Sequence, residues 1–407
     1  MNYKPRPKRS AFGTARSPQA PRRSFNSGQR RGGGRGPSKQ HINHSRLIKR
    51  AVQPKGEEIF VPKHTFADFN LGEGLQANLK ALGYEMPTPI QDQAIPAAME
   101  GRDVLGLANT GTGKTAAFLL PLIEKVLADY QKESVLILAP TRELAQQIEA
   151  ELIGFAKGLR LGSVTIIGGS AMGPQLAKLR RNPHFVIGTP GRVRDLINRG
   201  AIHLDKYSNI VLDEVDRMLD MGFVAEIKQV LAEMPEKRQS LFFSATISRD
   251  IEQLIAGFLR DPVNITVSNG ETTDSVDQDI VRVEGGKKKI DVLHDLLIRE
   301  DMKRVLVFGE TKFGVERLTT ELDNRGFKAV SIHGNKSQGQ RSRAIGAFKN
   351  GDVNIMVATD VAARGIDIKD ITHVINYDLP NTYDDYTHRI GRTGRGGKIG
   401  YALTFVD

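Results

Sequence analysis

The stretch Ala108-Asn109-Thr110-Gly111-Thr112-Gly113-Lys114-Thr115 gives the first indication of fold and chemistry. It follows an apolar run, Asp103 to Leu107, and precedes a helix-like run, Thr115-Ala-Ala-Phe-Leu-Leu-Pro-Leu-Ile-Glu-Lys125. This order predicts a strand, a glycine-bearing turn and the start of a helix. Glycines let backbone N–H groups approach an anion, the helix N-terminus adds a partial positive charge, and Lys114 supplies a full one. The stretch therefore predicts a phosphate-binding site.

Thr115 extends this interpretation, because its hydroxyl stands where a phosphate-bound Mg²⁺ takes a ligand. A second acidic element supports it about a hundred residues later, where an apolar strand ends in acids, Val211-Leu-Asp213-Glu214-Val215-Asp216. Such an element is typical of a Mg²⁺-nucleotide site. The P-loop pattern G-x-x-x-x-G-K-[ST] has glycine where Ala108 stands, so a glycine-rich turn ahead of a core helix stays the alternative.

Composition limits the class of protein. A chain of 407 residues is long enough for two ordinary domains and a tail. It contains no cysteine, which excludes disulfides and thiolate metal sites. No apolar run approaches the roughly 20 residues of a membrane span, and the N-terminus has no apolar signal core. We expect a cytoplasmic, monomeric protein without membrane association.

The net charge of +11 is concentrated at the N-terminus. Residues 1–63 contain 16 Lys and Arg but only two acids, which gives +14, whereas the remaining 42 basic and 45 acidic residues give −3. The same segment is poor in apolar residues and rich in Arg, Gly, Ser and Pro, so we expect it to be disordered. A polycation of this kind can bind nucleic acid phosphates without reading bases. A solubilising or targeting segment is the alternative.

From about Phe66, apolar strands alternate with helical patterns, which predicts parallel sheets flanked by helices. A polar stretch, Ser268 to Ser275, interrupts the alternation and indicates a linker over 269–275 between two doubly wound α/β lobes, 64–268 and 276–407. The expected strands are Val135–Ala139, Val164–Ile167, Phe185–Ile187, Ile210–Leu212 and Leu241–Phe243 in the first lobe, and Val305–Phe308, Ala329–Ile332, Ile355–Val357, Val374–Ile375 and Tyr401–Phe405 in the second.

Polar motifs follow these strands, where the functional residues of open α/β sheets gather. They are Pro140-Thr141-Arg142, Gly168-Gly169, Thr189-Pro190-Gly191-Arg192, Asp213-Glu214-Val215-Asp216, Ser244-Ala245-Thr246 and, in the second lobe, Thr359-Asp360. A single strand-end Thr or Gly is usually a turn or an N-cap. An ordered series of them is typical of a site.

In this order the motifs resemble those of the DEAD-box RNA helicases, ATP-dependent enzymes of helicase superfamily two, over about residues 64–407. The resemblance implies two tandem RecA-like domains. Pro87-Thr-Pro-Ile-Gln91 is similar to the family's Q motif, whose glutamine reads the adenine edge. Tyr84 and Phe66 stand where that family places aromatic residues near the base. The alternative for these two rings is an ordinary core position.

The resemblance also implies roles in ATP hydrolysis. Thr110, Gly111, Thr112, Gly113, Lys114 and Thr115 would hold the phosphates and Mg²⁺, and Asp213 would bind Mg²⁺ through water.

 Glu214 would orient or deprotonate the attacking water. In the second lobe, His388 would contact these acids or their neighbours, and Arg392 and Arg395 would be arginine fingers that stabilise charge on the γ-phosphate. Asp367, beside Gly365, would hydrogen-bond the ATP ribose.

Contacts to RNA are implied for both lobes. In the family, these regions grip the backbone of single-stranded RNA and bend it when the lobes close on ATP, which separates short duplexes without reading sequence. The matching residues are Pro140, Thr141, Arg142, Gly169, Thr189, Gly191 and Arg192 in the first lobe and Thr311, Gln338, Arg341, Thr359 and Asp360 in the second. Ser244 and Thr246 match the element that couples nucleotide state to this grip.

Two departures from the family pattern bear on the interpretation. Val215 replaces alanine in the acidic motif, and we expect the packed strand end to accommodate it. The sequence also ends at Asp407, soon after the final strand, so the N-terminal tail is the expected accessory RNA-binding element. An ATP-gated RNA clamp with little turnover would retain every motif and stays open as an alternative function. A DNA helicase of the same superfamily fits less well, because it would more plausibly lack the Gln91 motif.

The charge distribution predicts the effect of a truncation. Deleting residues 1–63 should leave basal ATP hydrolysis intact but weaken RNA binding and flatten its salt dependence, since most counterion release would come from the tail. RNA affinity measured against salt concentration for both proteins checks this. An unchanged affinity and slope would make the tail a solubility or targeting segment.

Overall fold

The computed structural model describes residues 43–52, 60–109, 111–267, 274–363, 368, 370–395 and 398–406. Residues 1–42, which make up most of the predicted tail, lie outside this range, as do residues 269–273 of the predicted linker. Within the described range, no helix is both long enough and apolar enough to cross a membrane.

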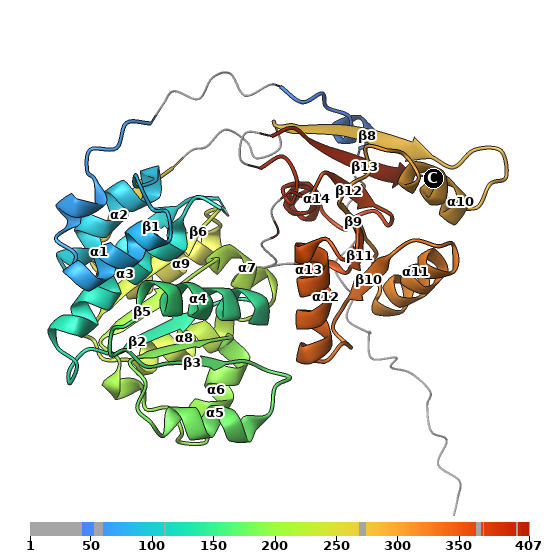
Figure 1. Cartoon of the computed structure of the whole chain (residues 1–407). Coiled ribbons are helices and arrows are strands. Elements are labelled where there is room, and N and C mark those ends of the chain that lie inside the picture. The colour runs from blue at the N-terminus through green and yellow to red at the C-terminus, as the bar shows by residue number, and fades with distance from the viewer. Residues whose placement is uncertain are drawn as a thin grey trace, which may run out of the picture. The chain divides into compact units, whose positions relative to one another are not determined.

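The first lobe is built on a parallel sheet with the strand order β3-β4-β2-β5-β6-β1-β7 (Figure 1). Every pairing in this sheet is parallel, so the carboxyl ends of all its strands lie at one edge. The strands are β1 (Val104–Leu107), β2 (Val135–Leu138), β3 (Ser163–Ile166), β4 (Phe185–Gly188), β5 (Asn209–Leu212), β6 (Gln239–Ser244) and β7 (Val263–Thr266).

Helices connect these strands, as expected for a parallel sheet. The α-helices are α1 (Glu73–Ala81), α2 (Pro89–Met99), α3 (Lys114–Ala128), α4 (Arg142–Phe155), α5 (Met172–Leu179), α6 (Pro190–Asn198), α7 (Val215–Asp220), α8 (Val224–Glu233) and α9 (Arg249–Phe258), and two short 3₁₀ helices are η2 (Phe66–Phe69) and η3 (Leu204–Lys206).

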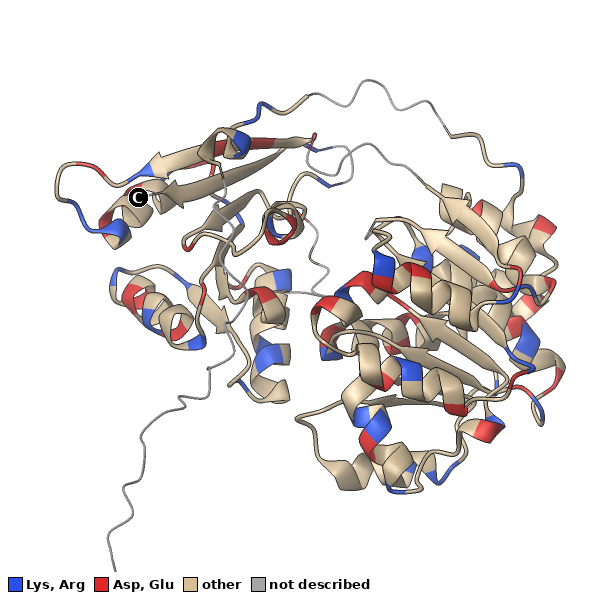
Figure 2. Cartoon of the chain, turned by 180° about the vertical axis from the view of Figure 1, so that it is seen from behind, with Lys and Arg blue, Asp and Glu red and all other residues tan. Residues whose placement is uncertain are grey.

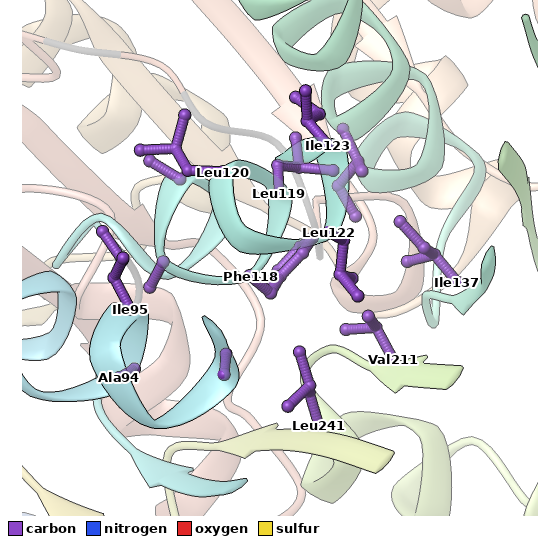
Figure 3. Packing of buried hydrophobic residues seen from close by; sticks show 14 of the residues in the cluster. Ala94, Ile95, Phe118, Leu119, Leu120, Leu122, Ile123, Ile137, Val211 and Leu241 are labelled. Carbon is purple, nitrogen blue, oxygen red and sulfur yellow. The ribbon is translucent and has the colours of Figure 1, made fainter. Parts of the chain in front are cut away.

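The sheet of the first lobe is buried on both faces. In β2, Val135 and Ile137 belong to a core cluster formed with α1 to α4, whereas Leu136 and Leu138 belong to a second cluster formed with α5 to α9. Alternating side chains of a strand point to opposite faces, so an unbroken apolar strand is required here. Figure 3 shows the first cluster, in which Phe118 of α3 is completely buried.

The second lobe repeats this architecture with the strand order β10-β11-β9-β12-β13-β8, again wholly parallel. Its strands are β8 (Val276–Arg282), β9 (Val305–Phe308), β10 (Ala329–Ile332), β11 (Ile355–Ala358), β12 (His373–Asn376) and β13 (Gly400–Val406). Its helices are α10 (Lys289–Leu297), α11 (Lys312–Asn324), α12 (Gln338–Asn350), α13 (Asp360–Ala363) and α14 (Tyr383–Ile390). The predicted fold class, two parallel-sheet α/β domains, is confirmed.

Part of the predicted tail is ordered, which corrects the expectation of disorder over residues 1–63. Residues 43–52, called here the N-terminal arm, contain the 3₁₀ helix η1 (His44–Leu47), and the Leu47 side chain is completely buried in a core cluster of the second lobe. Lys49 also forms an antiparallel bridge with Gln278 of β8. One apolar side chain and a backbone pairing partner thus order a segment whose composition indicates disorder.

Two strands, β7 and β8, were not predicted from the sequence. They lie on either side of the polar linker. In β8, acidic Asp277 and Asp279 alternate with other residues, so the strand lacks the apolar run used to find the others. The predicted linker also extends too far at its C-terminal end, because Asp274 and Ser275 make hydrogen bonds within the second lobe.

Figure 2 shows acidic and basic residues interspersed over the elements of both lobes, in keeping with their small net charge.

Candidate active site and nucleic-acid interface

The predicted phosphate-binding stretch forms the expected turn between β1 and α3. Gly113 precedes the helix with a φ of +92°, a left-handed conformation that favours glycine. Lys114 begins α3, is buried, and donates a hydrogen bond from Nζ to the Ala108 carbonyl at 2.8 Å. The Thr112 hydroxyl donates to the Asn109 carbonyl. The turn therefore holds its lysine within the loop and places Thr115 in the first turn of the helix.

Gln91 ties the neighbouring helix α2 to this loop. Its Nε2 donates to the Gly113 carbonyl at 3.1 Å, and its Oε1 accepts from the Thr88 backbone N–H at 2.9 Å. A Cβ atom at Gly113 would lie 2.5 Å from Gln91 Nε2, so only glycine fits this contact. The glutamine side chain is almost completely buried. Its amide thus has a structural role in the loop, in addition to the adenine contact implied by the resemblance.

The two candidate adenine-stacking rings belong to an aromatic cluster. Phe66 packs edge-to-face on Phe69 and Tyr84, with centroid distances of 5.8 and 5.9 Å, and Tyr84 packs edge-to-face on Phe155. Phe66 is only 7% exposed, whereas Tyr84 is half-buried. Phe66 is therefore a core residue, which was the alternative considered for it. Only its small exposed part could contact a base.

Three carboxylates follow β5 at the same edge of the sheet as the phosphate loop. Asp213 is buried and accepts a hydrogen bond from the Glu214 backbone N–H. Burial raises the pKa of Asp213 well above its ordinary value, in spite of the opposing charge of Lys114. A carboxylate held in this way gains from a nearby cation, which is typical of a functional site.

Glu214 adopts a left-handed backbone conformation, with φ +52° and ψ +55°, at the start of α7. Residues in this region store strain and cluster at functional sites. Both carboxylate oxygens of Glu214 accept hydrogen bonds from Arg217 Nη1, at 3.0 and 2.8 Å, and both side chains are buried. Arg217 was not singled out from the sequence, although its spacing of three residues from a glutamate within a helix start is compatible with an ion pair. Val215 is buried in a core cluster and is accommodated, as expected.

Asp216 links this acidic segment to the end of β6. One of its carboxylate oxygens accepts hydrogen bonds from the backbone N–H groups of Ala245 and Thr246 and from the Thr246 hydroxyl. The Ser244 hydroxyl in turn accepts from the Asp216 backbone N–H and donates to the Thr246 carbonyl. The two predicted coupling residues are therefore brought together with the acids, and Asp216, which was not assigned a role, is the residue that joins them.

The candidate RNA-contacting residues of the first lobe lie at the ends of β2, β3 and β4, at the edge that carries the phosphate loop. Thr141 caps α4, and its hydroxyl accepts from the Leu144 N–H. The Arg142 guanidinium lies against Gly169, whose φ of +72° and close approach leave no room for a side chain. Arg192 donates to the Ser170 carbonyl. Thr189 begins α6 as its N-cap, with Gly191 in the first turn and Pro140 just after β2.

In the second lobe, a buried arginine organises the carboxyl edge of the sheet. Arg389 of α14 makes two hydrogen bonds to the Asp360 carboxylate, at 2.5 and 2.7 Å, and donates to the Asp378 carbonyl. These bonds fix the Asp360 carboxylate against α14, and its contact with RNA stays a prediction. His388 and Arg392 line one small pocket with these two residues. Arg395 donates to the Gly391 carbonyl.

The other candidate RNA contacts of the second lobe begin helices. Thr311 caps α11 and accepts from the Gly314 N–H, and Gln338 is the first residue of α12. Arg341 is buried and donates to the carbonyls of His333 and Ala362, and Thr359 follows β11.

Glu316, which the sequence did not single out, holds the loop before α12. It accepts hydrogen bonds from Ser331, His333 and Lys336. Burial opposes its ionisation, but these bonds outweigh that effect and lower the pKa of Glu316 to about 2. The carboxylate is therefore charged at neutral pH and fixes the start of the helix that carries Gln338.

Three predicted site residues, Thr110, Gly365 and Asp367, lie outside the described residues. Within the described part of the chain, no group of three or more His, Asp or Glu side chains could hold a metal ion by itself. A Mg²⁺ site that relies on phosphate oxygens and water, with Thr115 and Asp213 as protein partners, fits this donor set.

The fold and the site together define a protein of two RecA-like lobes with a P-loop and a strand-end acidic motif. A family model described as DEAD/DEAH box helicase matches residues 88–254, and one described as Helicase conserved C-terminal domain matches residues 288–397. The ATP-dependent RNA helicase CshA of Limosilactobacillus reuteri is 45% identical over 342 residues, which are 84% of this chain and 69% of that protein. The chain belongs to the DEAD-box family of ATP-dependent RNA helicases.

Two further proteins show the same relationship. The DEAD-box ATP-dependent RNA helicase CshA of Bacillus subtilis (strain 168) is 43% identical over 342 residues, 84% of this chain and 69% of that protein. A solved structure of S. cerevisiae Dbp5 bound to RNA and ADP BeF3 superposes with a TM-score of 0.74 at 30% identity, covering 84% of this chain and 89% of that one.

The buried Glu214–Arg217 pair leads to a stability prediction. Arg217→Met should destabilise the first lobe by about 3–5 kcal/mol, because it leaves the Glu214 carboxylate buried without its partner. Denaturant unfolding measures the loss. The control is Arg199→Met, which removes an exposed pair with Asp195 and should cost about 1 kcal/mol or less. Equal losses for the two variants would contradict the importance of the buried pair.

Proposed function

We propose that this protein closes its two lobes on ATP and single-stranded RNA, bends the RNA strand, separates short duplexes locally, and hydrolyses ATP to release the strand. The observation that carries the proposal is the convergence of Lys114, Asp213 and Glu214 with the hydrogen-bonded Asp216–Thr246 link at one edge of the first sheet. A phosphate-binding loop, buried acids and a connection to a neighbouring strand are the parts that a nucleotide-driven switch requires.

The phosphates of ATP would be held by the loop from Thr110 to Thr115. Lys114 would exchange its hydrogen bond with the Ala108 carbonyl for the β- and γ-phosphates, a charge-assisted interaction and therefore a stronger one. Mg²⁺, when bound by Thr115 and by Asp213 through water, would neutralise charge on the phosphates. The raised pKa of Asp213 supports this assignment, because a cation would offset the burial that opposes its ionisation.

Hydrolysis would depend on Glu214 and on the second lobe. To orient the attacking water, the Glu214 carboxylate would either break its hydrogen bonds with Arg217 or accept a further one from the water. Arg392 and Arg395 would place guanidinium groups on the γ-phosphate, His388 would contact the acids, and Gly365 and Asp367 would lie at the ribose. Because these groups belong to the second lobe, hydrolysis would require closure.

RNA would bind along the carboxyl edges of both sheets through its backbone. Helix N-termini and turns present backbone N–H groups there, and Arg142 and Arg192 add positive charge. The Asp216 link would transmit the state of the nucleotide to this surface, since a shift of the acidic motif must move Thr246 as well. Contacts to the backbone carry no sequence information, so the core activity would not depend on sequence.

Two variants of the nucleotide site test the proposal. Lys114→Ala should abolish RNA-stimulated ATP turnover, because the only full positive charge of the loop is lost. Glu214→Gln should preserve ATP binding while slowing hydrolysis, since proton acceptance is lost but shape remains. Steady-state ATPase assays with and without RNA, together with nucleotide binding, check both. Near wild-type turnover by the lysine variant would refute the nucleotide site, and a wild-type protein that binds RNA with ATP but turns over little would favour a clamp.

A second test separates the two roles of Gln91. If its amide reads adenine, the wild-type protein should prefer ATP to GTP by roughly 1–3 kcal/mol in kcat/KM, because guanine would leave amide groups unpaired. Gln91→Ala should then reduce this preference as well as the affinity. If the amide only supports Gly113, the variant should weaken ATP and GTP equally and leave their ratio unchanged. Comparable wild-type kcat/KM for both nucleotides would exclude adenine reading.

A further inference from the structure

The N-terminal arm, residues 43–52, is attached to the second lobe by its backbone and by one apolar side chain. The Lys49 N–H donates to the Gln278 carbonyl at 3.0 Å, and the Gln278 N–H donates to the Lys49 carbonyl at 2.7 Å. The Val52 N–H donates to the Asp274 carbonyl. Leu47 is completely buried in the cluster that includes Tyr386 and Ile390 of α14.

Charged side chains of the arm add contacts at its edges. Lys49 Nζ lies 2.6 Å from the Asp274 carboxylate, and Arg50 pairs with Asp277 at 3.0 Å. The Arg46 guanidinium lies 5.7 Å from the centre of the Tyr383 ring. Because these groups are largely exposed, their pairs contribute little, so burial of Leu47 and the backbone pairing hold the arm in place.

The residues that receive the arm also hold the segment with the proposed arginine fingers. The Tyr386 hydroxyl of α14 donates to Gln278 Oε1 at 3.0 Å, and the Ser275 hydroxyl donates to the Gly394 carbonyl at 2.6 Å. Gly394 has a φ of +67°, and a Cβ atom there would lie 2.8 Å from Ser275 Oγ. The turn between Arg392 and Arg395 is therefore packed directly against the start of β8, the strand on which the arm lies.

We propose that the arm is a brace that positions Arg392 and Arg395 for ATP hydrolysis, with Leu47 as its positioning residue. The inference rests on the proposed function. Leu47 shares a core cluster with Tyr386 and Ile390 of α14, Gln278 joins the arm to Tyr386, and Ser275, next to Asp274, bonds to the turn that follows α14. The loop of Lys114 and the Gln91 side chain, which would hold ATP before the lobes close, lie in the first lobe. Loss of the arm should therefore lower the rate of hydrolysis and leave the affinity for ATP unchanged.

Two truncations separate the arm from the basic segment before it. Deletion of residues 1–42 removes 11 Lys and Arg residues and no acids but keeps the arm, whereas deletion of residues 1–52 removes both. The first protein should lose RNA affinity and keep its kcat at saturating RNA. In the second, kcat should fall between about tenfold and a hundredfold, as expected when catalytic groups are displaced by a change far from the reaction. This replaces the intact hydrolysis expected from the charge distribution for deletion of residues 1–63, because charge alone does not show that Leu47 is buried in the second lobe.

Point variants in the full chain give the matched comparison. Leu47→Asp should lower kcat as the longer deletion does. Leu47→Met, which keeps an apolar side chain of similar size, should retain the wild-type kcat. Ile48→Asp is the control, because Ile48 adjoins Leu47 but is 49% exposed. Affinity for a fluorescent ATP analogue should be unchanged in all three. Assays below the first thermal transition of each variant, with saturating RNA, ensure that folded protein is compared.

The outcomes are distinguishable. Equal kcat for the two truncations, or for Leu47→Asp and Ile48→Asp, in the presence of an active wild-type protein would overturn the brace and leave the proposed function standing. A parallel loss of ATP affinity and kcat would also overturn it, because a general loss of structure would then account for the effect. A wild-type protein without RNA-stimulated hydrolysis would overturn both proposals.

Discussion

Burial of three carboxylates at the end of β5 is the constraint on which the site of the first lobe depends. A buried charge without a partner is strongly destabilising, so each acid requires a fixed group beside it. Asp213 has the Glu214 N–H, Glu214 has Arg217, and Asp216 has Thr246 and its neighbours. These requirements fix α7 relative to the end of β6. Because the three acids lie within four consecutive residues and each has its own fixed partner, the segment is suited to a switch.

The second lobe meets a similar requirement with an arginine. Burial of the Arg389 charge without Asp360 would strongly destabilise the lobe. The pair joins α13, the helix after β11, to α14. Tyr386 and Ile390 of the same helix share a core cluster with Leu47, so residues far apart in the sequence form the core beside the proposed finger segment. In both lobes, candidate site residues adjoin a short helix, α7 or α14, that an arginine–carboxylate pair helps to fix.

The sequence predicted the apolar strands well, because a strand buried on both faces is an apolar run, as Val305–Phe308 shows. The site motifs were found because they follow such strands. What was missed depends on tertiary contacts. Strand β8 alternates in polarity, Leu47 is a single apolar residue in a basic segment, and Arg217 is recognisable as a partner only once Glu214 is buried. Gln91 had a role assigned by resemblance, whereas its contact with Gly113 required the structure.

The path of the chain through its lobes has a consequence for biosynthesis. The arm belongs to the second lobe, yet more than 200 residues separate Lys49 from Gln278, its backbone pairing partner. On the ribosome the arm is made before its docking surface, β8 with α14. Such non-local contacts form late and slowly. The first lobe can fold while the arm is still undocked. Completion of the second lobe is then the step at which exposed Leu47 and the unpaired edge of β8 are removed from solvent together.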